Sequence, residues 1–398
     1  MIYILLAIYL LNVFYIKRKK LYKSSFFIHF FFISIIFIGP PVYYELGFTT
    51  YAHSFEWEDV ITFEKYGIAV FCCSLIFLYL LAHRRKSIFN GLFTQYVNKN
   101  SSLTLIYFIF WFGVVLSYLL FYFNHFPVVK FILTGSLPER LDQSESVKLF
   151  YTFSSFFMVF IPSGYFFFIR FLKTNLSKFL LLLLVVFILT SGGHKGLVTF
   201  FIIFALLFSG YKFNLKKLLI SFFALIGLLS IYTVTKGREF NKETFYYLLE
   251  SPPRRFFVTQ GSAFITRISM DRRDLYVGNV HEYQLIKRET FQSIYPGLNE
   301  KGAAPTMFLG DLHVRYGYIV TMLCYVLYLA FLFPFIKGTD NMKERYLYLW
   351  WNLFIFFFMT GMAEFSSTSI LRMGLAFFNF IVLLIIPHLR LKNVQIAA

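Results

Sequence analysis

Residues 302–336 read GAAPTMFLGDLHVRYGYIVTMLCYVLYLAFLFPFI. A polar run with Asp311, His313 and Arg315 leads directly into about 20 apolar residues, the length of a helix that crosses a bilayer. The polar run closes a segment, residues 236–315, which holds 12 of the chain's 38 basic residues and nine of its 20 acidic ones. The sequence therefore predicts a membrane protein with one large polar loop.

The composition supports lipid as the solvent for most of the chain. Hydrophobic residues make up 58%, aromatic residues 22% and charged residues 15%, whereas soluble domains are about 45–50% apolar. We expect an all-α polytopic membrane protein with about eleven transmembrane helices. The predicted spans are residues 1–16, 26–44, 66–82, 103–123, 149–169, 179–191, 197–211, 218–235, 316–336, 346–365 and 372–389. They give three regions: 1–235 with eight helices, the loop 236–315, and 316–398 with three helices and a short tail.

The distribution of charge predicts the orientation. Twenty lysines and arginines, but only two acidic residues, lie in loops that follow odd-numbered spans. Loops rich in Lys and Arg stay in the cytoplasm, so we expect the N-terminus outside, the C-terminus inside and residues 236–315 outside. The remaining 18 basic residues are matched by 18 acidic ones. The pI of 9.6 thus reflects membrane topology, and no nucleic-acid partner is expected.

The cysteines and histidines indicate neither a disulfide framework nor a metal site. Cys72, Cys73 and Cys324 all fall inside predicted spans, so the loops must be ordered by packing on the membrane helices. No Cys/His pattern has zinc spacing. We expect no metal and no cofactor.

Residues 191–196, Ser-Gly-Gly-His-Lys-Gly, separate spans 6 and 7. Glycines permit a sharp turn, and the start of the next helix offers free amide groups beside Lys195. This arrangement suits an anion such as phosphate. The alternative is a tight turn with a lysine that reaches to the membrane surface.

The large loop is predicted to contain two helices. Ser251-Pro252-Pro253 is a helix-start signal, after which Phe257, Gly261, Phe264 and Ile268 share an apolar face and Arg255, Thr259, Ser262, Thr266, Ser269 and Arg273 the opposite one. Such a helix lies on the membrane surface, lines a cleft, or simply presents a solvated face. The second helix is expected to start at Asn279, to stop before Tyr295, and to carry His281, Lys287 and Arg288.

Asp311, His313 and Arg315 form the third region of interest. Ionisable side chains at a bilayer edge are costly and tend to be functional, although an Asp–Arg pair that anchors the helix end is the simpler explanation. Arg140, Glu364 and Arg372 are weaker candidates on the same face.

In layout, nearly the whole chain resembles the Wzy family of O-antigen and capsule polysaccharide polymerases, which have a similar number of spans and one dominant late external loop. Three pieces of sequence carry the resemblance. They are the Ser191–Gly196 turn, the run from Gly302-Ala-Ala-Pro305 to Gly310-Asp-Leu-His-Val-Arg-Tyr-Gly317, and Arg267 followed by Gly278. The chain departs from the family pattern at His313, where Tyr is common, and at Arg315, where an acidic residue is common.

The resemblance implies a GT-C-like fold in the bacterial inner membrane with a periplasmic active face. It implies a metal-independent glycosyltransferase of lipopolysaccharide or capsule biosynthesis that joins oligosaccharide repeat units carried on undecaprenyl pyrophosphate. The lipid-linked oligosaccharide is both donor and acceptor, surrounded by membrane lipids, and a Wzz-like regulator sets chain length.

This chemistry gives the candidate residues their expected roles. Arginine pairs with phosphate oxygens, and a base near neutral pKa removes the acceptor proton. The predicted pyrophosphate ligands are Arg140, Lys195, Arg255, Arg267, Arg288 and Arg315. His313 is the preferred base, with Asp311 and His194 as alternatives.

Three other functions remain open at this stage. An O-antigen ligase-type glycosyltransferase shares the layout and donor but uses another acceptor. A lipid-oligosaccharide flippase or other transporter would be expected to show internal repeats and charges within its spans, and neither is evident. A non-enzymatic partner in an envelope complex is the third.

Overall fold

The computed structural model describes residues 1–45, 55–83, 102–135, 160–169, 172, 174–191, 201, 258–273, 283–294, 304, 306–340, 374, 378–379 and 382. All regular elements in these ranges are helices, and the chain divides into two compact units. The helices are α1 (Ile2–Arg18), η1 (Leu21–Lys23), α2 (Phe26–Glu45), α3 (Trp57–His83), α5 (Ser102–Tyr122), η2 (Phe123–His125), α6 (Pro127–Thr134), α9 (Asn175–Ser191), α13 (Thr259–Arg272), α14 (Tyr283–Ile294) and α15 (Phe308–Asp340).

Four of these helices are long and apolar enough to cross a bilayer. They are Phe26–Glu45, Trp57–His83, Leu105–His125 and Phe308–Pro334. The all-helical, multi-pass membrane character predicted from the sequence is therefore confirmed. The count of eleven stays a prediction, because the spans expected at 218–235 and 346–365 lie outside the described residues.

Two helices begin earlier than predicted. α3 starts at Trp57 instead of residue 66, with Glu58 and Asp59 in its first turn, where negative charge stabilises a helix start. α15 starts at Phe308 instead of residue 316, and its two parts meet at a break at Gly317. Parts of both predicted outer loops are thus helical.

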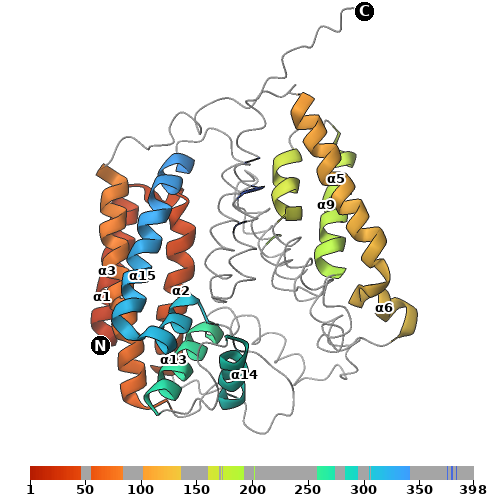
Figure 1. Ribbon diagram of the computed structural model, residues 1–398. Coiled ribbons are helices and arrows are strands. Elements are labelled where there is room, and N and C mark those ends of the chain that lie inside the picture. Colours follow the sequence, from red (N-terminus) through yellow and green to blue (C-terminus); the bar gives the residue numbers. More distant parts are fainter. Residues whose placement is uncertain are drawn as a thin grey trace, which may run out of the picture. The chain divides into compact units, whose positions relative to one another are not determined.

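The first unit is organised around α3, which contacts α1, α2, α13 and α15 (Figure 1). Contacts at Tyr66–His313, Ser74–Tyr325 and Leu81–Lys337 show that α15 runs parallel to α3. α1 is also parallel to α3, since Leu5 lies against Gly67 and the Asn12 side chain bonds the Phe71 carbonyl.

α2 runs in the opposite direction to α3. Its Phe26 ring packs against Phe77, and its Phe37 ring packs against Phe63. These relative directions match the sequence prediction, in which odd-numbered spans run one way and even-numbered spans the other. Which end faces the outside stays a prediction.

α13 and α14 pack at one end of this bundle, where α2 ends and α1, α3 and α15 begin (Figure 1). We call it the cap end and define it by Pro40, Tyr66, Gly261 and His313. Gly261 is required here, because a side chain at that position would overlap the Pro40 ring and the Ile36 carbonyl oxygen. The opposite end carries the basic residues at the end of α1, together with Lys337.

The second unit contains α5, α6 and α9. Trp111 of α5 is buried over Gly164 and donates a hydrogen bond from Nε1 to the Phe160 carbonyl, 3.2 Å away. Tyr107, Asn379 and Ser163 are joined by side-chain hydrogen bonds. Interhelical polar bonds of this kind stabilise membrane helix packing. The eight-residue α6 lies in a segment that was expected to be a loop.

Candidate functional site

α13 carries the residues around which the candidate site is built, and it is more deeply buried than expected. Gly261, Phe264 and Ile268 are buried, as their apolar face predicted, but Ser262 and Thr266 of the opposite face are buried too. The reason is that α13 contacts four helices, α2, α3, α14 and α15. Of the three alternatives left open for this helix, the solvated polar face does not hold at Ser262 and Thr266, because α13 is a packed part of the cap end.

The described helix starts at Thr259, after Val258, with no side-chain cap. The predicted start signal at 251–253 lies outside the described residues. The last described residue of α14 is Ile294, so the predicted stop before Tyr295 stays a prediction. Its first described residue is Tyr283, and the expected start at Asn279 lies outside the described part of the chain.

Arg267 and Asp311 form an ion pair that joins α13 to α15. The Arg267 guanidinium lies 2.5 Å from an Asp311 carboxylate oxygen, and both side chains are 0% exposed. A second guanidinium nitrogen donates to the Ala304 carbonyl at 3.3 Å. In this arrangement a ligand would have to displace Asp311 to reach Arg267. The assignments of Arg267 to pyrophosphate and of Asp311 to proton transfer stay predictions.

His313 lies beside this pair and contacts both α3 and α13. Its Nδ1 is 2.8 Å from the Tyr66 hydroxyl oxygen. Its Nε2 is 3.6 Å from an Asp271 carboxylate oxygen, and the two side chains are 10% and 42% exposed. A separation of 3.6 Å is too long for a direct hydrogen bond, and a ligand hydroxyl that reaches Nε2 would approach from beside the Asp271 carboxylate. We call Tyr66, Asp271 and His313 the histidine group.

Aromatic packing holds Tyr66 in place within this group. Its ring centroid lies 5.1 Å from that of Phe264 and 4.6 Å from that of Tyr318. Phe264 in turn contacts Phe37 and Phe63 edge-on. A side chain packed in this way has few alternative positions, so the phenol oxygen is fixed toward His313.

A network of charges ties the end of α13 to the start of α3. Arg272 donates to Asp59, at 2.8 Å, and also to Glu58 and Glu56, while Arg273 donates to Glu56. The Asp59 and Glu56 carboxylates raise the pKa of the Arg272 guanidinium above its usual range. This network is largely exposed, apart from Asp59, which is buried.

The remaining predicted site residues are placed only in part. Arg288 is exposed on α14, and Arg315 is half-buried in the first part of α15. Arg140, His194, Lys195 and Arg255 lie outside the described residues. Within the described part, no group of three or more His, Cys, Asp or Glu side chains is arranged to hold a metal ion.

Tyr66 and Asp271 were not anticipated. In the sequence, Tyr66 is the first residue of a predicted apolar span, and Asp271 is one of many charged residues in the polar loop. One signal was available: Asp271 follows Arg267 by four residues, which places both on one side of a helix. Nothing in the sequence pairs Tyr66 with a residue 247 positions away.

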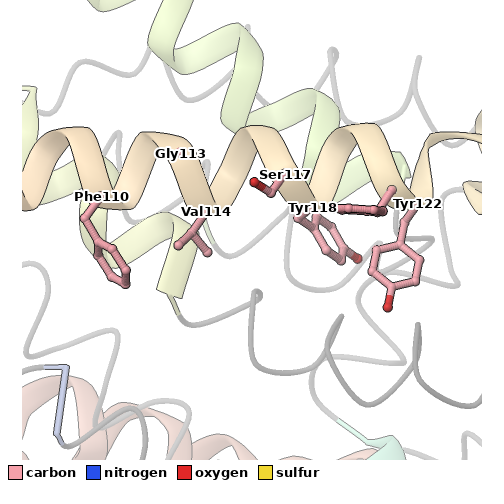
Figure 2. Close-up of a pocket in the computed structure, with 7 residues that line it drawn as sticks. Phe110, Gly113, Val114, Ser117, Tyr118 and Tyr122 are labelled. Atoms are coloured by element: carbon pink, nitrogen blue, oxygen red, sulfur yellow. The ribbon is translucent and has the colours of Figure 1, made fainter.

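The second unit offers a different kind of feature, a groove along α5 with a volume of about 610 Å³. It is lined by Phe110, Gly113, Val114, Ser117, Tyr118, Phe121 and Tyr122, and Figure 2 shows the labelled side chains along this helix. The lining is apolar apart from three hydroxyl groups and carries no ionisable acid or histidine. This lining suits contact with hydrocarbon, and among the described residues the histidine group belongs to the first unit.

Comparison with known protein families, with characterised sequences and with solved structures gives no significant match.

Proposed function

We propose that this protein is a polysaccharide polymerase that joins undecaprenyl-pyrophosphate-linked oligosaccharide repeat units at the outer face of the bacterial inner membrane. The observation that supports it most is the histidine group at the cap end. His313, near the start of the apolar helix α15, lies 3.6 Å from the Asp271 carboxylate at the end of α13 and contacts Tyr66 of the apolar helix α3. The motif resemblance supplies the substrate class.

His313 would act as the general base in this reaction. The acceptor sugar hydroxyl forms a bond to the anomeric carbon of the donor, and the bond from that carbon to the pyrophosphate oxygen breaks. The leaving undecaprenyl pyrophosphate takes the electron pair, and the hydroxyl proton passes to His313 Nε2. The Asp271 carboxylate, 3.6 Å away, stabilises the resulting imidazolium. The proton then leaves to water.

The pyrophosphate would be held by basic side chains. Arg288 and Arg315 lie on α14 and α15 of the first unit, and Arg140, Lys195 and Arg255 stay candidate ligands predicted from the sequence. Each charge-assisted hydrogen bond contributes about 1.5–3 kcal/mol, so several of them replace a metal ion in stabilising the leaving group. Arg267 is proposed to act mainly through its pair with Asp311, which fixes α13 against α15.

The proposed architecture has eleven transmembrane helices in a GT-C-like arrangement, with the cap end in the periplasm. The basic residues at the opposite end of the first unit support this orientation, because such residues stay on the cytoplasmic side. Cysteine labelling from outside intact cells tests it. A cysteine introduced at exposed Arg288 should react with an impermeant maleimide, and one introduced at Lys19 should not.

The decisive experiment is an assay with purified full-length protein, native lipid-linked repeat unit and a chelator, resolved by product size. A ladder of lipid-linked products supports the proposal. Unchanged substrate with folded protein contradicts it, and transfer of the sugar to a different acceptor supports the ligase alternative. Movement of intact substrate across vesicles without a new glycosidic bond supports the transporter.

A further inference from the structure

Four consecutive basic residues form the turn that leaves α1 toward α2. Lys17 and Arg18 lie in the last turn of α1, Lys19 is its C-terminal cap, and Lys20 precedes η1. All four side chains are exposed. We call residues 17–20 the basic turn. Like charges on neighbouring residues repel one another, so the basic turn favours the approach of anions.

The described part of the protein does not supply these anions. Among the described residues, no acidic side chain forms an ion pair with the basic turn. The described acidic residues of the first unit belong to the cap end, apart from Asp340, the last residue of α15. Lys337 is a further cation at the end of the unit that carries the basic turn. The charge of the basic turn is therefore balanced from the surroundings.

The backbone of Lys20 is strained. Its φ of 54° and ψ of 30° lie in the left-handed region, and it is the only non-glycine residue with a positive φ in the described part of the chain. Glycine adopts this conformation freely, whereas an L side chain raises its energy. A strained residue persists where its surroundings stabilise it, and the only polar group of this side chain is an exposed ammonium.

The basic turn lies where a membrane-crossing helix begins. α2, a candidate membrane span, starts at Phe26, shortly after Lys20. Between and beside them, Tyr22 is 49% exposed and Phe27 is 36% exposed. Exposed aromatic rings next to a span are typical of the boundary between lipid hydrocarbon and headgroups. The four cations thus lie at the level of the headgroup phosphates, with apolar rings nearby.

We infer that the basic turn is a binding site for the headgroup of an anionic phospholipid such as phosphatidylglycerol, with Tyr22 and Phe27 against the upper part of its acyl chains. Clustered lysines and arginines next to a span attract anionic lipid, and each charge adds to the attraction. A free phosphate shares the charge but has no hydrocarbon for the two rings. The inference does not rest on the proposed function, because it needs only the charge and its place beside a span.

The test is native mass spectrometry of the full-length protein in neutral detergent. The protein is mixed with equal amounts of phosphatidylglycerol and phosphatidylcholine that have the same acyl chains, and the bound lipids are counted. Phosphatidylglycerol should be bound in preference, and the preference should fall as ammonium acetate is added, because salt screens the attraction. Equal binding of the two lipids at low salt would overturn the inference.

Lys20→Gly separates lipid binding from folding. It removes one charge and relieves the backbone strain, so the protein without lipid should melt at the same temperature or higher, yet bind phosphatidylglycerol about fivefold more weakly. Lys20→Arg should bind as the unmodified protein does. Lys65→Gln, at an exposed lysine of α3 at the cap end, is the matched control and should also bind normally. Unchanged binding by Lys20→Gly, or an equal loss in Lys65→Gln, would contradict the site.

Two further measurements identify the ligand. The combined variant with glutamine at all four positions of the basic turn should lose most of the preference for phosphatidylglycerol. Excess glycerol phosphate, which carries the anion without hydrocarbon, should leave the bound lipid in place, and displacement would overturn the assignment to lipid in favour of a simple phosphate site. These measurements contain no sugar substrate, so their outcome is independent of whether the protein forms a glycosidic bond.

Discussion

Two pairs of charged or titratable side chains join the same two helices, α13 and α15. These pairs, Arg267–Asp311 and Asp271–His313, differ in burial and in separation. The first pair is 0% exposed and in contact at 2.5 Å. The second is 10% and 42% exposed and separated by 3.6 Å. The first pair is a direct contact inside the protein, whereas the second is longer and partly exposed. The more deeply buried charges therefore fix the helices, and the adjacent, more exposed pair is the one that we propose meets a substrate.

The largest expected effect on stability comes from removing one partner of the Arg267–Asp311 pair. Arg267→Ala leaves the Asp311 carboxylate buried without its cation, which should cost about 3–5 kcal/mol in the free energy of unfolding. Thermal unfolding in detergent, followed by loss of the monodisperse species, measures the change. The double variant Arg267→Met with Asp311→Leu should recover most of the loss, because it removes both charges. Arg267→Ala protein that is as stable as the unmodified protein would contradict a structural role for the Arg267–Asp311 pair.

Substitutions in the Asp271–His313 pair should affect activity more than stability. His313→Gln should lower the rate of sugar transfer about 10²- to 10⁴-fold, because it removes the proposed base, while the melting temperature changes little. Asp271→Asn should cause a smaller loss of rate. Rates from the size-resolved assay, with Tyr318→Phe as the matched control, test this. Full activity of His313→Gln would exclude it as the base.

Packing of α13 on α2 positions both pairs together. Gly261→Ala places a methyl group against Pro40 and the Ile36 carbonyl, so we expect a loss of about 1–3 kcal/mol in unfolding free energy. Gly113→Ala on α5 is the matched control, because a Cβ there meets nothing within 4 Å, and it should be neutral or slightly stabilising. Equal melting temperatures for the two variants would argue against close packing at the cap end.

The smallest effect is expected at the exposed network. Arg272→Gln should lower the melting temperature less than Arg267→Ala does, because the Arg272 guanidinium is partly exposed and the glutamine amide can still donate to the buried Asp59 carboxylate, and the difference should shrink as salt is added. Asp59 and Glu56 raise the pKa of Arg272, so the contribution of its charge is complete below the ordinary arginine pKa and is lost only above its raised value. The effect of Arg272→Gln should therefore stay constant from neutral to moderately alkaline pH. A large loss of melting temperature that does not shrink with added salt would show that Arg272, like Arg267, acts through a buried ion pair.

The sequence predicts the membrane helices of the first unit and their alternating directions, because apolar length and loop charge depend on local composition. It also selects Asp311 and His313, as charges next to a span, and Arg267 through the motif resemblance. It does not predict that Ser262 and Thr266 are buried, since burial of α13 depends on four helices from distant parts of the chain. Tyr66 is missed for the same reason, because its contact with His313 joins α3 to α15.

The most direct test compares the two pairs in one set of preparations, by measuring product ladders and melting temperatures for Arg267→Met with Asp311→Leu and for His313→Gln. We predict that the apolar double variant folds and still forms a ladder, whereas His313→Gln folds and does not. A folded double variant without product, beside an active His313→Gln variant, would contradict the division between a structural pair and a reactive one.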